Sequence, residues 1–342
     1  MKAIIYSSNG GSDVLQAVER PVLEPGPGEV RVKVHVSGVN PTDWKSRQGS
    51  TGSLAEGDEQ VPNQDGAGRI EAVGEGVDAS RIGERVWLYE AAHGRPHGGT
   101  AQEFTTIPAG QAVPLPDTAT FDLGAGLGVP ALTAHRALTL AEDGPRRLAP
   151  GALAGRSVLV AGGAGAVGNA AIQLARWAGA TVLSTVSSPQ KAELATAAGA
   201  EHVVNYRTGR AVDAIRAIVP DGVDLVVEVA PAVNAALDAG VLRNNGTVAY
   251  YANNGGDSLT LPVRDVMGRN LAWHGLLLYT LPAAAKADAV AAVSAAVAAG
   301  AMRIGEDAGL PLHRFPLAET AKAHEAVEGG AVGKVLIDVA DA

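Results

Sequence analysis

One stretch, residues 156–177, constrains the fold more than any other part of the chain. It begins with a short β-branched and apolar run, continues with closely spaced glycines and ends with apolar side chains at helical spacing. Gly163, Gly165 and Gly168 match G-x-G-x-x-G. In that pattern the glycines permit a tight turn, a close approach of backbone to pyrophosphate and close packing of helix on strand. The order of strand, glycine turn and helix therefore predicts a dinucleotide-binding site.

The amides of the first helical turn, with the positive end of the helix dipole, are expected to face the phosphates. Glycine makes up 43 of the 342 residues, so the motif alone can arise by chance and an ordinary glycine-rich loop is the alternative. The flanking strand and helix supply the context that the motif needs. The expected cofactor contacts in this loop are Gly162, Gly163, Gly165, Ala166, Val167 and Gly168.

The end of the next predicted strand indicates which dinucleotide is bound. An acidic residue about 20 positions after the glycines usually binds the ribose 2′-hydroxyl and selects NAD. No carboxylate stands there, and Ser187, Ser188 and Lys191 follow instead. Two hydroxyls and an ammonium can hold a 2′-phosphate, so NADPH is the expected cofactor. Tyr206, at the end of the third predicted strand, is expected to contact the same phosphate or the adenine, the alternative being an edge residue of the sheet.

Composition excludes several classes of function. A chain of 342 residues suits two domains better than one. The absence of cysteine excludes disulfides, thiolate metal ligands and a cysteine nucleophile. The formal charge of −9, without a cluster of Lys and Arg, gives little support for a nucleic acid or membrane partner. Residues 1–6 resemble a first strand with no long apolar segment behind them, so neither a signal peptide nor a membrane span is expected and the cytoplasm is the expected compartment.

The first part of the chain is rich in short alternating runs separated by glycine and proline. Residues 29–36 place four valines on one face, which predicts a strand with one buried side. Three further runs predict strands in what we expect to be a β-barrel-like domain: 68–73, 85–89 and 101–107.

From about residue 127 strands and helices alternate, which predicts a doubly wound parallel sheet. The predicted strands are residues 157–161, 181–186, 202–206, 222–228, 246–251 and 271–278. An alanine-rich helix over 282–301, a helix over 316–328 and a closing strand over 333–339 are expected to return to the first domain. The predicted fold is thus α/β, with a first domain from residues 1–126 and 281–342 and a dinucleotide-binding domain from residues 127–280.

The sequence resembles the quinone oxidoreductase branch, zeta-crystallin-like, of the medium-chain dehydrogenase/reductase superfamily. The resemblance covers essentially the whole chain, and its segments occur in the order found in that family. They are residues 37–47, 64–74, 83–86, 132–134, 161–168, 205–207 and 333–335. The resemblance implies a GroES-like catalytic domain, a Rossmann dinucleotide domain, a cofactor cleft between them and a homodimer joined near residues 271–278.

Zinc-dependent alcohol dehydrogenases of the same superfamily carry a cysteine where this chain has Asn40, and a histidine and glutamate where it has Gln64 and Asp65. Neither this catalytic site nor a structural zinc site can form from the residue types present, so no metal is expected. His93 and His97 form a close pair, but they lie in a loop interrupted by glycine and proline and are more typical of a solvated segment.

Asn40 is the residue that we expect nearest the nicotinamide and the substrate, because its amide can both donate and accept. Asp43 is expected to tether the loop of Asn40 or to relay a proton, the alternative being an aspartate that caps a turn. Family analogy places Thr133 at the nicotinamide ribose or carboxamide, the alternative being a hydroxyl at the start of a helix. It also implies cofactor contacts at Tyr251, Ala252, Asn253, Leu276, Leu277 and Lys334.

These features predict an NADPH-dependent, metal-free oxidoreductase that transfers hydride to a quinone. An enone or enoyl-thioester reductase and a non-catalytic NADPH-binding protein are the alternatives. Relatives often have tyrosines in the stretch after Asp43, where this chain has Lys45 and Thr51, so the identity of the acceptor stays open.

Overall fold

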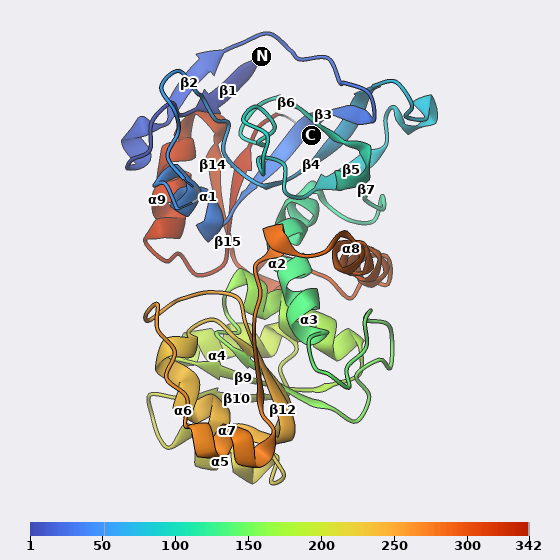
Figure 1. The fold of residues 1–342 in the computed structure, drawn as a ribbon. Coiled ribbons are helices and arrows are strands. Elements are labelled where there is room, and N and C mark those ends of the chain that lie inside the picture. Colours follow the sequence, from blue (N-terminus) through green and yellow to red (C-terminus); the bar gives the residue numbers. More distant parts are fainter. Residues whose placement is uncertain (51, 341–342) are drawn as a thin grey trace. The chain divides into compact units, whose positions relative to one another are not determined.

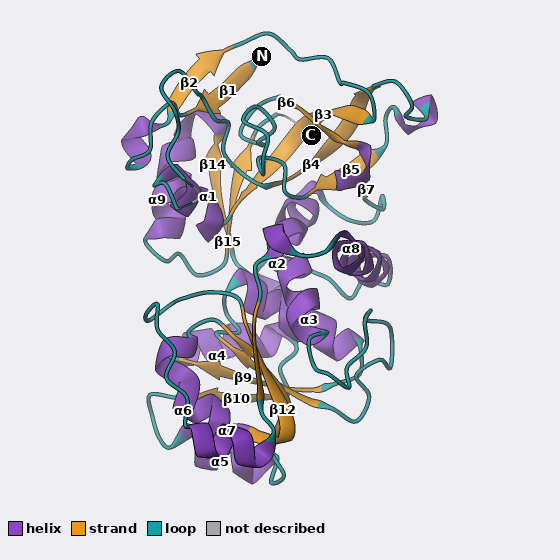
Figure 2. Ribbon diagram, in the orientation of Figure 1, coloured by secondary structure: helices purple, strands orange, loops and turns teal. Residues whose placement is uncertain are grey.

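The computed structural model describes residues 1–50 and 52–340, so Thr51 lies outside the described residues. The chain forms two compact units, each with its own sheet (Figures 1 and 2). The first comprises Met1–Val129 and the segment that begins at Leu312, and the second comprises Pro130–Pro311. These boundaries correct the expectation that residues 281–311 belong to the first domain.

The first unit is built on a sheet in the order β14-β15-β3-β4-β5-β7, and β6 also pairs with β3. The strands are β3 (Glu29–Val39), β4 (Asp65–Val73), β5 (Arg85–Leu88), β6 (Phe104–Pro108), β7 (Ala112–Pro114), β14 (Leu312–Pro316) and β15 (Lys334–Asp338). The expected alternation in β3 is confirmed, because its four valines are buried. A separate pair, β1 (Lys2–Ile5) and β2 (Gln16–Glu19), and the helices α1 (Pro41–Arg47) and α9 (Thr320–Glu328) complete this unit.

The second unit contains a parallel sheet in the order β10-β9-β8-β11-β12-β13. Its strands are β8 (Ser157–Ala161), β9 (Thr181–Val186), β10 (His202–Asn205), β11 (Val223–Glu228), β12 (Leu242–Tyr250) and β13 (Ala272–Gly275). The order reverses between β8 and β11, and ligands of such sheets bind outside the carboxyl ends of the strands at that point. The doubly wound sheet predicted from the sequence is confirmed, although β13 is shorter than expected.

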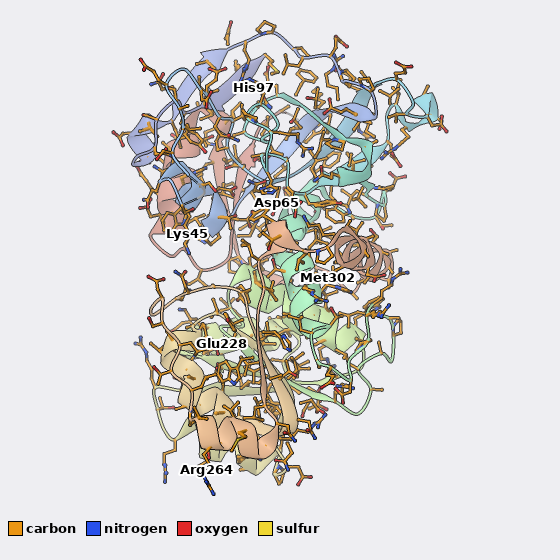
Figure 3. The ribbon with its side chains drawn as sticks, viewed as in Figure 1. Lys45, Asp65, His97, Glu228, Arg264 and Met302 are labelled. Carbon is orange, nitrogen blue, oxygen red and sulfur yellow. The ribbon has the colours of Figure 1, made fainter. Side chains whose placement is uncertain are left out.

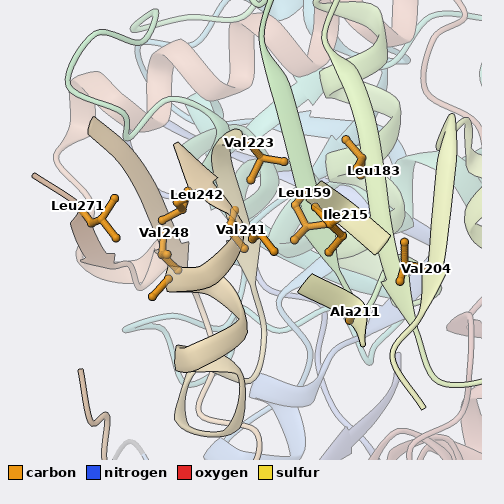
Figure 4. Close-up of a cluster of buried hydrophobic side chains, with 12 residues drawn as sticks. Leu159, Leu183, Val204, Ala211, Ile215, Val223, Val241, Leu242, Val248 and Leu271 are labelled. Carbon is orange, nitrogen blue, oxygen red and sulfur yellow. The ribbon is translucent and has the colours of Figure 1, made fainter. Parts of the chain in front are cut away.

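Helices cover this sheet, and buried apolar side chains hold two of them against it. The helices are α3 (Ala166–Trp177), α4 (Pro189–Ala198), α5 (Ala211–Ile218), α6 (Pro231–Val241), α7 (Val263–Arg269) and α8 (Ala283–Ala298); α2 (Phe121–Leu138) precedes them. Leu159, Leu183 and Val248 from the strands pack with Ile215 of α5 and Val241 of α6 (Figure 4). One face of the sheet is thereby sealed by α5 and α6.

The alanine-rich helix α8 contacts α3 of the second unit instead of returning to the first. Small side chains along one face of α8, including Ala289, Ala292 and Ala296, are buried and allow close approach. Beyond the helix, Gln173 of α3 donates to the carbonyl of Arg303 at 3.1 Å. These contacts explain why residues 281–311 group with the second unit.

Among residues 1–50 and 52–340, the structure contains no helix that is both long enough and apolar enough to cross a bilayer.

Candidate functional site

The loop between β8 and α3 has the shape that a pyrophosphate site requires. A Cβ added at Gly163 would lie 2.2 Å from Oγ of Ser184, and one at Gly168 would lie 2.4 Å from the carbonyl oxygen of Gly162. At Gly165, by contrast, the nearest atom would be the Gly162 oxygen at 3.4 Å. Gly163 and Gly168 are therefore required by packing within the protein, whereas Gly165 leaves an open surface at the N-terminus of α3. Such a cradle fits a phosphate group.

The expected 2′-phosphate residues gather at the start of α4. Ser188 is the residue before this helix, and its Oγ accepts a hydrogen bond from the backbone nitrogen of Lys191 at 3.3 Å. The hydroxyl hydrogen of Ser188 stays free to donate elsewhere, because an oxygen that accepts can still donate. Ser187 and Lys191 are half-buried beside it, and Tyr206 is exposed just beyond β10. Two hydroxyls, one ammonium and a helix N-terminus form a donor set that suits a phosphate dianion.

The other expected cofactor residues occupy three places. Thr133 is buried well inside α2, so the alternative that it starts a helix was wrong. Tyr251 directly follows β12, and its backbone nitrogen donates to the carbonyl of Glu228 at 3.2 Å. Leu276 follows β13 and donates to the carbonyl of Tyr250 at 2.9 Å. The remaining members of these runs are Ala252, Asn253 and Leu277. The runs of residues after β12 and β13 thus lie at the carboxyl ends of neighbouring strands, and their contacts with a cofactor stay predictions.

Asn40, in the first unit, is held by two charged side chains. Its Nδ2 donates to Oδ2 of Asp65 at 2.7 Å, and its Oδ1 accepts from Nζ of Lys334 at 2.7 Å. All three side chains are buried. An ammonium can only donate and a carboxylate can only accept, so this pair of contacts fixes the orientation of the Asn40 amide. Lys334 thus donates a hydrogen bond to Asn40 within the first unit. Its contact with a cofactor stays a prediction.

Asp43 organises the turn that carries Asn40. Asn40 has extended backbone before Pro41, which is the first residue of α1, and Oδ2 of Asp43 accepts from the backbone nitrogen of Asn40 at 2.7 Å. Oδ1 of Asp43 accepts from the backbone nitrogen of Gln64 at 3.1 Å. Asp43 therefore caps the helix, as the turn-capping alternative expected, and it also ties the helix to the segment that carries Asp65. A proton relay by Asp43 stays a prediction.

The carboxylates of this network titrate near neutral pH. Burial raises the pKa of Asp65 to about 6, although the charge of Lys334 and the bond from Asn40 oppose the shift. Burial likewise raises the pKa of Asp43 to about 7, against the hydrogen bonds from the backbone of Asn40 and Gln64. Burial lowers the pKa of Lys334. We refer to Asn40, Asp43, Asp65 and Lys334 as the buried polar network; Asp65 is labelled in Figure 3.

A chain of hydrogen bonds links this network to α9. Nε2 of His324 lies 2.9 Å from Oδ1 of Asn63, and Nδ2 of Asn63 donates to Oγ of Ser37 at 3.0 Å. Ser37 contacts Thr100 at 2.7 Å, and Thr100 donates to the carbonyl of Asp65. Because the Asn63 oxygen can only accept, Nε2 of His324 carries the proton. Burial lowers the pKa of His324 to about 3, so the imidazole is neutral.

A cavity of about 380 Å³ lies within the first unit, next to Asp43. Its walls include Tyr6 from the segment after β1, Ser46 of α1, and the consecutive residues Asn63 and Gln64. This volume is in the range of pockets that bind small molecules. The polar walls and the neighbouring network make the cavity the candidate acceptor site of this unit.

No cluster of three or more potential metal ligands (His, Cys, Asp or Glu) occurs in the described part of the chain. At Asn40 and Asp65 the cation that balances the carboxylate is the ammonium of Lys334, 3.9 Å from Oδ2 of Asp65. His97 lies beside Arg20 and Glu59 on an exposed loop.

Sequence reasoning missed the partnership of Asp65 and Lys334 with Asn40, and it missed His324 altogether. It also missed Glu228, which is buried at the carboxyl end of β11 and accepts from Nδ2 of Asn234 at 3.1 Å (Figure 3). Two polar residues six positions apart, Glu228 and Asn234, give no recognisable pattern. For Asp65 the sequence did offer one indication, because this residue stands between Gln64 and a glycine at the start of a strand.

Two family models match the chain. Residues 26–117 match the alcohol dehydrogenase GroES-like domain, and residues 166–295 match the family described as zinc-binding dehydrogenase. These matches fall in the first and second units respectively, which confirms the predicted combination of a GroES-like domain with a Rossmann domain.

Relatives cover the whole chain. The quinone oxidoreductase of Rattus norvegicus is 33% identical over 98% of this chain and 97% of its own. Among solved structures, an NAD-dependent alcohol dehydrogenase superposes with a TM-score of 0.84 at 27% identity, covering 99% of this chain and 100% of its own. The Escherichia coli quinone oxidoreductase, in complex with NADPH, superposes with a TM-score of 0.80 at 25% identity and the same coverage.

Proposed function

Because the chain belongs to the quinone oxidoreductase branch of the medium-chain dehydrogenase/reductase superfamily, we propose that it reduces a quinone with NADPH and without a metal. The observation that carries the proposal is the full-length similarity to a quinone oxidoreductase, at 33% identity over 98% of the chain. In the proposed reaction the quinone takes up one hydride and one proton, giving hydroquinone and NADP⁺.

NADPH is the proposed cofactor, although one close structural neighbour is named as NAD-dependent. The open surface at Gly165 would hold the pyrophosphate, and Ser187, Ser188 and Lys191 would hold the 2′-phosphate. No carboxylate stands at the end of β9 to prefer a ribose 2′-hydroxyl. When bound, NADPH would supply the hydride from nicotinamide C4.

In the proposed reaction, the buried polar network holds the amide of Asn40 in a fixed orientation. Asn40 keeps one N–H of its amide after donating to Asp65, and its orientation is fixed by Lys334. A donor that is held in place before the reaction stabilises developing negative charge on an acceptor oxygen without the cost of reorganisation. Asp43 accepts hydrogen bonds from the backbone nitrogens of Asn40 and Gln64, and it thereby holds these two segments together. We propose Asn40 as the catalytic residue and Asp43 as its positioning residue.

The chemistry of these side chains supports the proposal that no zinc takes part. An amide bound to an ammonium and a carboxylate is a poor zinc ligand, and Lys334 already supplies positive charge at Asp65. A quinone needs less electrophilic help than a simple ketone, because its ring delocalises the incoming charge. Donors such as Asn40 can then replace a Lewis acid.

A homodimer joined through β13 is the proposed assembly. β13 is the last strand of its sheet, so no strand among the residues that the structure describes pairs with its outer edge. Exposed apolar side chains lie nearby in sequence, at Val263 and Met267 of α7 and at Leu277. Antiparallel pairing of two such edges would cover these groups.

Initial rates with NADPH and three acceptors test the proposal: a benzoquinone, a cyclic enone and an enoyl-CoA. The quinone should give the highest kcat/KM on protein purified without chelator and free of stoichiometric zinc. A higher kcat/KM for the enone or the thioester would instead identify an alkene reductase. Tight NADPH binding without turnover of any acceptor would identify a non-catalytic NADPH-binding protein.

A further inference from the structure

Gln64 has an unusual position in the wall of the cavity near Asp43. Its backbone is held at both ends: its nitrogen donates to Oδ1 of Asp43 at 3.1 Å, and its carbonyl accepts from the nitrogen of Ala91 at 2.9 Å. The residue is only 7% exposed. Yet Oε1 of its side chain is buried and has no hydrogen-bond partner within residues 1–50 and 52–340.

An unpaired amide oxygen in such a position weakens the fold. A buried polar atom without a partner costs ~1–3 kcal/mol relative to a paired one, and most native structures avoid it. The preceding residue adds to this cost, because Asn63 has a φ of 77°, in the left-handed region. His324 and Ser37 hold the Asn63 side chain in that conformation. The surroundings therefore hold Gln64 rigidly against the cavity at the expense of stability, which is typical of a binding residue.

We propose that the side-chain amide of Gln64 binds the oxygen of the acceptor in this cavity. The inference rests on the proposed function, since it takes the acceptor to be a quinone. It adds a residue that contacts the acceptor and a place for the acceptor's ring, inside the first unit.

An amide suits both redox states of such a ligand. The carbonyl oxygen of a quinone accepts from Nε2, and the hydroxyl of the hydroquinone product donates to Oε1. A half-turn of the terminal torsion of Gln64 exchanges the two atoms, and that torsion is soft. The cavity, at about 380 Å³, has room for a single-ring quinone.

The test compares Gln64→Met and Gln64→Glu with the unaltered protein. Methionine preserves the length of the side chain but removes its hydrogen bonds, and ionised glutamate keeps acceptors but cannot donate. The dissociation constant of duroquinone is measured by ligand-observed NMR on cofactor-free protein, and thermal unfolding is recorded for each variant. Because the chain has no cysteine, thiol addition to the quinone does not disturb the measurement.

Gln102→Met is the matched control. Gln102 is also a buried glutamine whose Oε1 is unpaired, but its Nε2 donates to the carbonyls of His97 and Gly99, and the described walls of the cavity do not include it. Gln102→Met should lower the melting temperature and leave duroquinone binding unchanged.

For both Gln64 variants we expect duroquinone to bind about tenfold more weakly. The melting temperature should stay the same or rise in Gln64→Met, which is the variant compared with Gln102→Met, whereas the buried carboxylate of Gln64→Glu lowers it. Binding within twofold of the unaltered protein would overturn the proposal, as would weaker binding accompanied by a fall in melting temperature like that of Gln102→Met. Absence of duroquinone binding to the unaltered protein would overturn it as well. The NADPH-dependent rates of the unaltered protein, measured separately, decide the proposed function whichever of these results is obtained.

Discussion

Nζ of Lys334 lies 2.7 Å from Oδ1 of Asn40 and 3.9 Å from Oδ2 of Asp65, with all three side chains buried. The lysine therefore does two things. It fixes the direction of an amide, and it balances a carboxylate that burial would otherwise keep protonated. This relationship leads to the first of four predictions.

Replacing Lys334 with methionine should destabilise the protein at pH 8 by ~3–5 kcal/mol, because the ionised Asp65 is left without its counter-charge. Urea unfolding followed by circular dichroism measures the loss. The double variant Lys334→Met, Asp65→Asn removes both charges and should regain part of the stability. Additive losses in the double variant would argue that the two side chains do not interact energetically.

Gly165→Ala should leave the free energy of unfolding nearly unchanged but weaken NADPH binding. The added methyl group would touch only the Gly162 oxygen, at the contact distance of 3.4 Å, and it would lie where a pyrophosphate must approach the backbone. Gly163→Ala is the matched control, because its methyl group would collide with Ser184 and should cost ~1–3 kcal/mol of stability. Calorimetry and fluorescence titration of both variants provide the comparison. Unaltered NADPH affinity in Gly165→Ala would contradict a pyrophosphate site there.

Lys191→Ala should reduce the preference for NADPH over NADH by ~1.5–3 kcal/mol, the size of a charge-assisted hydrogen bond. Fluorescence titrations with each cofactor measure this preference. Gln190→Ala, on the preceding exposed residue of α4, should leave it unchanged. If the unaltered protein binds both cofactors equally, the 2′-phosphate assignment is incorrect.

His324→Gln should alter how stability depends on pH. Burial lowers the pKa of folded His324 from 6.5 to about 3, so the neutral imidazole stabilises the fold above pH 6.5, and this stabilisation is lost as the pH falls towards 3. Between pH 7 and pH 5 the unaltered protein should therefore lose about 2 kcal/mol more than the glutamine variant. Urea titrations at the two pH values test this. An equal loss of stability in both proteins between pH 7 and pH 5 would mean that folded His324 is protonated at pH 5, as it is in the unfolded chain.

The sequence was sufficient for the second unit because its signals are local. The strand, glycine turn and helix around Gly165 lie within some twenty residues, and the predicted bounds of β8 and β9 match the structure. The parallel order of the sheet then follows from the alternation of strands and helices.

The buried polar network could not be predicted from local patterns, because its contacts join residues that are far apart in the sequence. Lys334 meets Asn40 across 294 residues, and His324 meets Asn63 across 261. A lone lysine before an apolar run resembles the first residue of an exposed strand, and nothing local indicates that it is buried. The expected site residues included Asn40 and Lys334, but nothing in the sequence indicated that these two side chains are in contact.

The misplaced helix α8 illustrates a related limit. Alanine predicts a helix strongly, but it carries little information about which surface the helix will cover. Ala289 and Ala296 are buried on a helix that contacts α3, and small side chains allow such close approach, but either unit could have offered a surface for them.

The position of β15 has a consequence for synthesis on the ribosome. β3 gains its partner β15, and Asn40 gains Lys334, only after the whole second unit has been translated. All segments of the second unit emerge before that moment, so it can fold while the first unit still lacks a central strand. Until Lys334 arrives, Asp65 has no counter-charge to favour its ionised form. The first unit is thus completed after the second, and a nascent chain that stalls between residues 311 and 334 holds a complete second unit beside an incomplete first one.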